Sequence, residues 1–224
     1  MNKLNLQSFT TELADSIFQV NKGLFYTVKE LSLRPGHTIR AFIEGKRKNH
    51  FKPIAYALLL STVYFLIARI FDSTTLLDDF VTGASNRVEE EKLAVEFPIL
   101  EWFANNYAYA TLLLIPIFSL ASFISFLGLK ANYLEHVVIN AYVTGHQAII
   151  YAVFALVSPY FNDNDINVLL AVTISVTFNF WTYLQFFKGS NKVLLVLRFI
   201  LSYGLYYFII SLLLAVFMLV DLLF

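Results

Sequence analysis

Five long apolar stretches constrain the fold of this chain more than any other feature of its sequence. The hydrocarbon core of a bilayer is about 30 Å thick, and a helix needs about 20 apolar residues to cross it. A soluble core does not need apolar runs of that length. The predicted membrane spans lie near residues 53–71, 107–127, 137–158, 167–187 and 193–220. The sequence therefore predicts an all-α, polytopic membrane bundle of about five transmembrane helices.

The composition agrees with lipid as the main solvent. Only 14% of the residues are charged and 58% are hydrophobic, whereas soluble domains carry about 25% charged residues. The chain has no cysteine, which excludes disulfides, thiolate metal sites and cysteine nucleophiles. Residues 1–16 contain no apolar segment typical of a removable signal peptide, so we expect the first span to direct insertion.

The distribution of Lys and Arg predicts how the bundle is oriented. Nine of the sixteen Lys and Arg residues lie within residues 1–52. Four more, Lys130, Lys188, Lys192 and Arg198, lie near span ends that would be on the same side of the membrane. Because cytoplasmic loops carry the excess of Lys and Arg, we expect the N-terminus in the cytoplasm and the C-terminus outside. Residues 72–106 would then form an acidic, partly helical loop on the outer side.

The sequence divides into two predicted parts. Residues 1–52 should form an amphipathic segment at the cytoplasmic surface, and residues 53–224 should form the transmembrane bundle. Apolar residues recur at three- and four-residue steps from residue 9 to residue 31, which is the spacing of one helical face. This helix should end near Arg34, because proline disfavours helix at the residue before it. Gly36 then permits a turn, and a second short helix is expected over residues 37–44.

Six cations of this segment are candidates for contact with anionic lipid headgroups: Arg34, Arg40, Lys46, Arg47, Lys48 and Lys52. Each cation near an anionic surface contributes about 1 kcal/mol to binding. The competing interpretation is that these charges only set the topology. The expected partner is the lipid bilayer, with anionic lipids at its inner surface. A net charge of zero argues against nucleic acid, and a protein partner or a second copy of the chain is left open.

The same segment resembles a family of unknown function among bacterial multi-pass inner-membrane proteins. The resemblance rests on the string LRPGHTIRAFIEGKRKNHFKP at residues 33–53, with its RPG turn, its I-x-x-F-I-x-G-K-R stretch and its aromatic-x-P entry into the first span. Many members carry an N-terminal zinc ribbon, and this chain has no cysteine to build one. The resemblance therefore implies a bacterial inner membrane but no activity, metal or cofactor.

Polar residues at the start of the third span form a second candidate site: Glu135, His136, Asn140 and His146. Ionisable groups inside a membrane are costly, so they suggest function by default. Glu135, His136 and His146 could line a path for a proton, an ion or a lipid headgroup, since imidazole exchanges protons near neutral pH. The alternative is that they hydrogen-bond neighbouring helices.

These patterns predict an integral membrane protein that acts as a non-enzymatic scaffold or accessory protein, or as a conduit for lipid or ions. The alternative is a lipid-modifying enzyme that uses Glu135, His136 and His146 as acid and base. No cofactor is predicted, and no residue spacing indicates a metal site.

Overall fold

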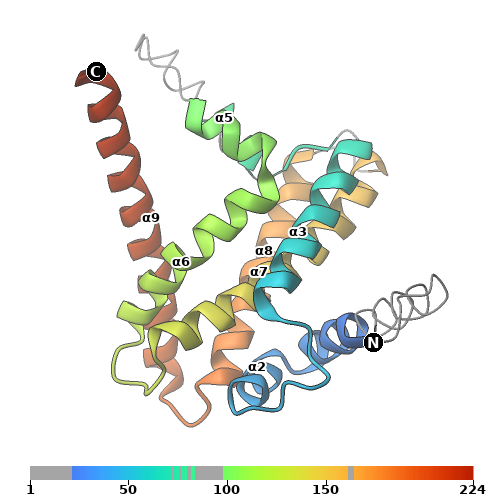
Figure 1. The fold of residues 1–224 in the computed structure, drawn as a ribbon, viewed down its shortest axis with the longest axis vertical. Helices are drawn as coiled ribbons and strands as arrows, with labels where there is room; N and C mark the ends of the chain where they lie inside the picture. Colours follow the sequence, from blue (N-terminus) through green and yellow to red (C-terminus); the bar gives the residue numbers. More distant parts are fainter. Residues whose placement is uncertain are drawn as a thin grey trace, which may run out of the picture.

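The computed structural model describes residues 22–71, 73–75, 77–79, 82–83, 98–160 and 164–223 (Figure 1). Every regular element within these ranges is a helix, as the sequence predicts. The predicted amphipathic pattern before residue 22 and the acidic run at residues 89–91 lie outside the described ranges. Residues 22–33 are helical and carry the last part of that pattern.

Five helices are long and apolar enough to cross a membrane, one for each predicted span. They are α3 (Pro53–Ile70), α6 (Tyr107–Ser125), α7 (Tyr133–Val157), α8 (Asn164–Phe186) and α9 (Lys192–Leu223). The shorter elements are α2 (Pro35–Ile43), α5 (Pro98–Asn105) and the single turn η1 (Ser158–Tyr160). The chain is therefore a helical membrane protein with five candidate spans.

Helix α7 is the central element of the bundle and contacts α3, α6 and α8. Half of its apolar window is buried inside the protein, against 11% for α9. The helix begins at Tyr133, earlier than the predicted span, because Asn132 and Glu135 form a capping box. The Asn132 side chain accepts the Glu135 backbone N–H, and the Glu135 carboxylate accepts the Asn132 N–H, both at 2.9 Å.

Glycine allows α7 to approach α3 closely at Gly145. A Cβ at this position would lie 2.5 Å from Cδ1 of Tyr56 and 3.1 Å from Cα of Ala57. Small residues at helix contacts let backbones approach closely, which strengthens the van der Waals packing between helices in lipid.

Helix α2 lies at one end of the bundle, where α3 begins and α8 ends (Figure 1). Pro35 occupies the first helical turn, where its missing N–H costs nothing. The prediction that Gly36 forms a turn and that the helix starts at residue 37 is wrong, because Gly36 is buried inside α2. A Cβ on Gly36 would lie 2.4 Å from the backbone nitrogen of Phe186. The residue is glycine because α2 touches the backbone of α8.

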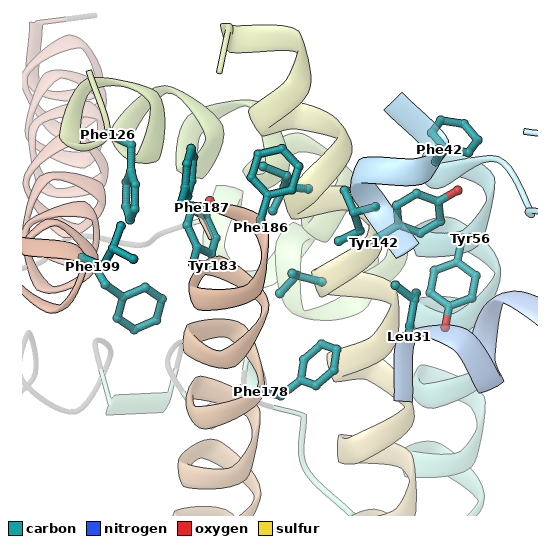
Figure 2. Packing of buried hydrophobic residues seen from close by; sticks show 14 residues of the cluster. Leu31, Phe42, Tyr56, Phe126, Tyr142, Phe178, Tyr183, Phe186, Phe187 and Phe199 are labelled. Atoms are coloured by element: carbon teal, nitrogen blue, oxygen red, sulfur yellow. The ribbon is translucent and has the colours of Figure 1, made fainter. Parts of the chain in front are cut away.

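Buried aromatic side chains hold this end of the molecule together (Figure 2). Phe126 and Phe187 stack with ring centroids 4.9 Å apart, and Tyr183 lies 4.9 Å from Phe126. Tyr56 and Tyr142 pack 5.7 Å apart elsewhere in the same cluster. The cluster fixes residues 22–33 and α2 to the spans. We call this end of the bundle the basic end, and it includes residues 34–52 and the loops 126–132 and 187–191.

Candidate functional site

A cavity of about 530 Å³ opens at the basic end, and we call it the basic cleft. Helix 22–33 contributes one wall, α2 a second, and the loop between α2 and α3 a third. The lining consists of Tyr26, Glu30, Arg34, His37, Thr38, Ala41, Gly45, Lys46, Arg47, Lys48, Asn49 and His50. Four of these residues are Lys or Arg and one is an acid, so the cleft carries a clear excess of positive charge.

Hydrogen bonds hold the loop that forms the third wall. The Phe51 backbone N–H donates to Thr27 Oγ1 at 2.8 Å, and the Tyr142 hydroxyl donates to the Phe51 carbonyl at 2.6 Å. Gly45 adopts a φ of 102°, a conformation that favours glycine, where the chain turns out of α2. The loop is therefore tied to helix 22–33 on one side and to α7 on the other.

Two cations in the cleft have defined partners. Arg34 Nε lies 2.7 Å from Oε2 of Glu30, and this hydrogen bond raises the pKa of Arg34. Arg47 lies over the Phe42 ring, with its guanidinium carbon 5.3 Å from the centroid, and its Nε donates to the Phe42 carbonyl. Stacking and one hydrogen bond thus orient Arg47.

His50 forms the aromatic side of the cleft. Its ring packs edge-on against Tyr26 at 5.2 Å and against Phe42 at 6.0 Å. Burial lowers the pKa of His50 below its ordinary value, so the ring is neutral near pH 7. His37 and His50 were not among the site residues predicted from the sequence. Their position next to the cations of residues 40–48 could have indicated that they belong to the same site.

The cleft gathers four of the six cations proposed for lipid contact: Arg34, Lys46, Arg47 and Lys48. Arg40 points elsewhere, because its guanidinium donates to the carbonyls of Gln185 and Phe186 and lies over the Phe186 ring. It therefore caps the C-terminal end of α8, where carbonyls lack helical partners. Lys52 is exposed at the start of α3, outside the cleft.

His136 and Asn140 lie in one buried polar network between α6, α7 and α8. Asn140 Nδ2 donates to Ser119 and Ser122 at 3.1 Å each, and its Oδ1 accepts the Tyr183 hydroxyl at 2.9 Å. Ser122 Oγ lies 3.0 Å from His136 Nδ1. His136 Nε2 is buried and has no hydrogen-bond partner. Two serines of α6 thus serve as hydrogen-bond partners for α7.

His146 has a separate set of partners. Its Nδ1 lies 3.1 Å from the Tyr56 hydroxyl, its Nε2 lies 3.3 Å from Ser32 Oγ, and its ring stacks on Phe178 at 4.5 Å. His136 and His146 are ten residues apart on one helix, which corresponds to about 15 Å along its axis. Glu135, for its part, caps the start of α7.

The three residues of the acid and base hypothesis therefore do not converge on one cavity in the structure. His136 and His146 have partners on different helices, and Glu135 bonds the cap of its own helix. Neither histidine lines the main cavities of the described residues. Among the described residues, no group of three His, Asp or Glu side chains is placed to hold a metal ion.

Residues 21–65 match the model of a protein family of unknown function, DUF3667. This match confirms the resemblance to an uncharacterised family, and it contains every lining residue of the basic cleft. No curated protein matches the chain, and no solved structure does.

Proposed function

We propose that the protein is a non-enzymatic membrane accessory protein that binds the phosphate headgroup of an anionic phospholipid in the basic cleft. The observation that carries this proposal is the gathering of Arg34, Lys46, Arg47 and Lys48 around one cavity. The cavity volume of about 530 Å³ falls within the range of about 300–1,000 Å³ typical of ligand sites.

The electrostatics of the cleft suit a phosphate. Its one acid, Glu30, is already paired with Arg34, so the charges of residues 46–48 have no opposing carboxylate among the lining residues. The guanidinium of Arg47 can present two parallel N–H donors to phosphate oxygens. Lys46 and Lys48 add point charges on flexible stems.

The position of the cleft supports a lipid as the source of the phosphate. The loop that forms its third wall leads directly into Pro53, the first residue of α3. The start of a membrane span lies near the headgroups of the bilayer. A phospholipid can therefore place its phosphate in the cleft while its acyl chains lie in the adjacent leaflet.

The test is native mass spectrometry of the full chain in detergent, titrated with phosphatidylglycerol or with phosphatidylcholine. We expect the chain to bind the anionic lipid more tightly. Changing Lys46, Arg47 and Lys48 together to Gln should weaken that binding about 100-fold, since each cation contributes about 1 kcal/mol. Inorganic phosphate, added as a competitor, separates a phosphate site from one that also requires the lipid chains.

The matched control removes three cations of the same end that lie outside the cleft: Lys52, Lys130 and Lys192. If these changes to Gln weaken phosphatidylglycerol binding as much as the first set, the effect is general surface charge and the proposal is wrong. Equal binding of phosphatidylcholine and phosphatidylglycerol to the wild type would also contradict it.

We further propose that the basic end faces the cytoplasm of a bacterial inner membrane, as the distribution of Lys and Arg favours. The absence of cysteine makes the chain a ready template for single-cysteine labelling. In intact cells, a membrane-impermeant maleimide should label Gly83→Cys and leave Ser190→Cys unlabelled until the cells are broken. The reverse pattern would overturn this orientation.

A further inference from the structure

A second cavity, of about 380 Å³, lies between the membrane spans themselves, and we call it the intramembrane cleft. Its walls come from α6, α7, α8 and α9. Figure 1 shows α9 leaning away from α7 and α8 beyond the region where it passes α6. The intramembrane cleft shares no lining residue with the basic cleft.

The lining of the intramembrane cleft is largely apolar, and the polar groups in it are uncharged. Amide and hydroxyl side chains line it from all four spans, among them Thr111, Asn140, Asn179 and Tyr203. None of its lining residues is Asp, Glu, Lys, Arg or His. A charged ligand group would lose its hydration there without gaining an opposite charge, which is very unfavourable. The site therefore suits an uncharged ligand.

Asn179 lines this cleft and has a hydrogen-bond acceptor without a partner in the protein. The residue is 2% exposed, and its Nδ2 donates to the Tyr203 hydroxyl at 2.8 Å. Its Oδ1 is buried and has no hydrogen-bond partner. Asn140, in contrast, uses both its amide nitrogen and its carbonyl oxygen within the protein. A buried acceptor without a donor costs about 1–3 kcal/mol, which a ligand hydroxyl can recover.

We propose that the intramembrane cleft binds a neutral lipid with a free hydroxyl group, of the diacylglycerol class, whose hydroxyl donates to Oδ1 of Asn179. The glycerol ester region would lie against the amide and hydroxyl groups of α7 and α8. The acyl chains would leave the cleft into the surrounding bilayer. This proposal does not depend on phosphate binding in the basic cleft, because the ligand chemistry and the residues differ.

The experiment uses the full chain reconstituted in phosphatidylcholine vesicles that contain a photoactivatable diacylglycerol with an alkyne handle. Mass spectrometry after irradiation should find cross-links on α6, α7, α8 and α9 at the cleft. Unlabelled dioleoylglycerol should compete with the probe. Its 3-O-methyl ether, in which a methyl group replaces the hydroxyl hydrogen, should compete about fivefold more weakly, because one hydrogen bond is lost.

Two pairs of variants connect the labelling to the cleft. Asn179→Leu should lower the labelling about fivefold, whereas Asn167→Leu should not change it. Asn167 is the matched control because it lies on the same helix, is buried and also has an unpartnered Oδ1, yet it does not line the intramembrane cleft. Val172→Trp should fill the cleft and abolish labelling there, whereas Ile174→Trp, on an exposed face of α8, should not.

Each other outcome contradicts the proposal. Equal competition by the methyl ether would show that the hydroxyl is not recognised. Equal competition by phosphatidic acid would show that the cleft does not select an uncharged head. If Asn179→Leu fails to fold, Val172→Trp keeps the amide in place and still tests occupancy, so unchanged labelling in that variant would overturn the site.

Discussion

The hydroxyl of Tyr56 on α3 lies 3.1 Å from Nδ1 of His146 on α7. The two helices also approach each other closely here, because Gly145, the residue before His146, packs against the Tyr56 ring. A polar residue deep in a span thus has a neighbouring helix as its partner. This geometry favours a structural role for His146 over a role in transport or catalysis.

Tyr56→Phe removes that partner and should lower stability. Interhelical hydrogen bonds in membranes contribute about 0.6 kcal/mol on average and up to about 1.7 kcal/mol, so we expect the melting temperature in detergent to fall by about 2–5 °C. Tyr109→Phe is the control, since the Tyr109 side chain is 60% exposed. Equal melting temperatures for wild type and Tyr56→Phe would show that the contact contributes nothing.

Gly36→Ala should destabilise the protein strongly. The new Cβ would meet the backbone of Phe186, which cannot move aside as a flexible side chain could. We expect a loss of about 3 kcal/mol or more, seen as a melting temperature about 10 °C lower. Gly204→Ala in α9 is the matched control. It has no atom within 4 Å of the added Cβ and should be neutral or slightly stabilising. Similar melting temperatures for the two variants would contradict the close packing of α2 on α8.

Arg40→Lys should separate stability from lipid binding. The variant keeps the positive charge but loses the planar guanidinium that reaches the carbonyls of Gln185 and Phe186. We expect a lower melting temperature, by about 3–6 °C, with unchanged phosphatidylglycerol binding in the native mass spectrum. A variant that melts normally but binds this lipid more weakly would place Arg40 in the lipid site instead.

The pH dependence of stability should reflect the protonation of His50. Its pKa is lower in the folded protein than in the unfolded chain, so the unfolded chain binds more protons as the pH falls below about 6.5. The stability that neutral His50 provides is therefore present above that pH and is lost on acidification. His50→Phe keeps the packing against Tyr26 and Phe42 and should show a smaller drop in melting temperature between about pH 7.5 and pH 5. His37→Gln, at an exposed position, should keep the wild-type drop.

The five spans could be predicted because hydropathy and length are local properties of the sequence. The start of α7 could also have been predicted, since Asn132 and Glu135 have the spacing of a capping box. The predicted span began later because this spacing was not used. Local patterns failed at Gly36. Its neighbour in space is Phe186, far away in the chain, and no pattern around the RPG string shows that contact.

The basic cleft could be predicted in part. The density of cations after α2 indicated a basic surface, and four of the six proposed residues line one cavity. That Arg40 faces α8 follows only from the packing of α2, which brings residues 185 and 186 within its reach. Asn179 was not among the site residues predicted from the sequence. Its unpartnered oxygen depends on how α8 and α9 pair, which the sequence does not show.

The order of synthesis gives the position of α9 a consequence for assembly. This helix leaves the ribosome after α6, α7 and α8, yet it supplies Tyr203 and the last wall of the intramembrane cleft. The amide of Asn179 therefore meets the acyl chains of the bilayer before Tyr203 arrives. Insertion of α9 must then enclose a lipid molecule or expel it, so we expect the lipids available during biogenesis to influence the yield of correctly folded protein.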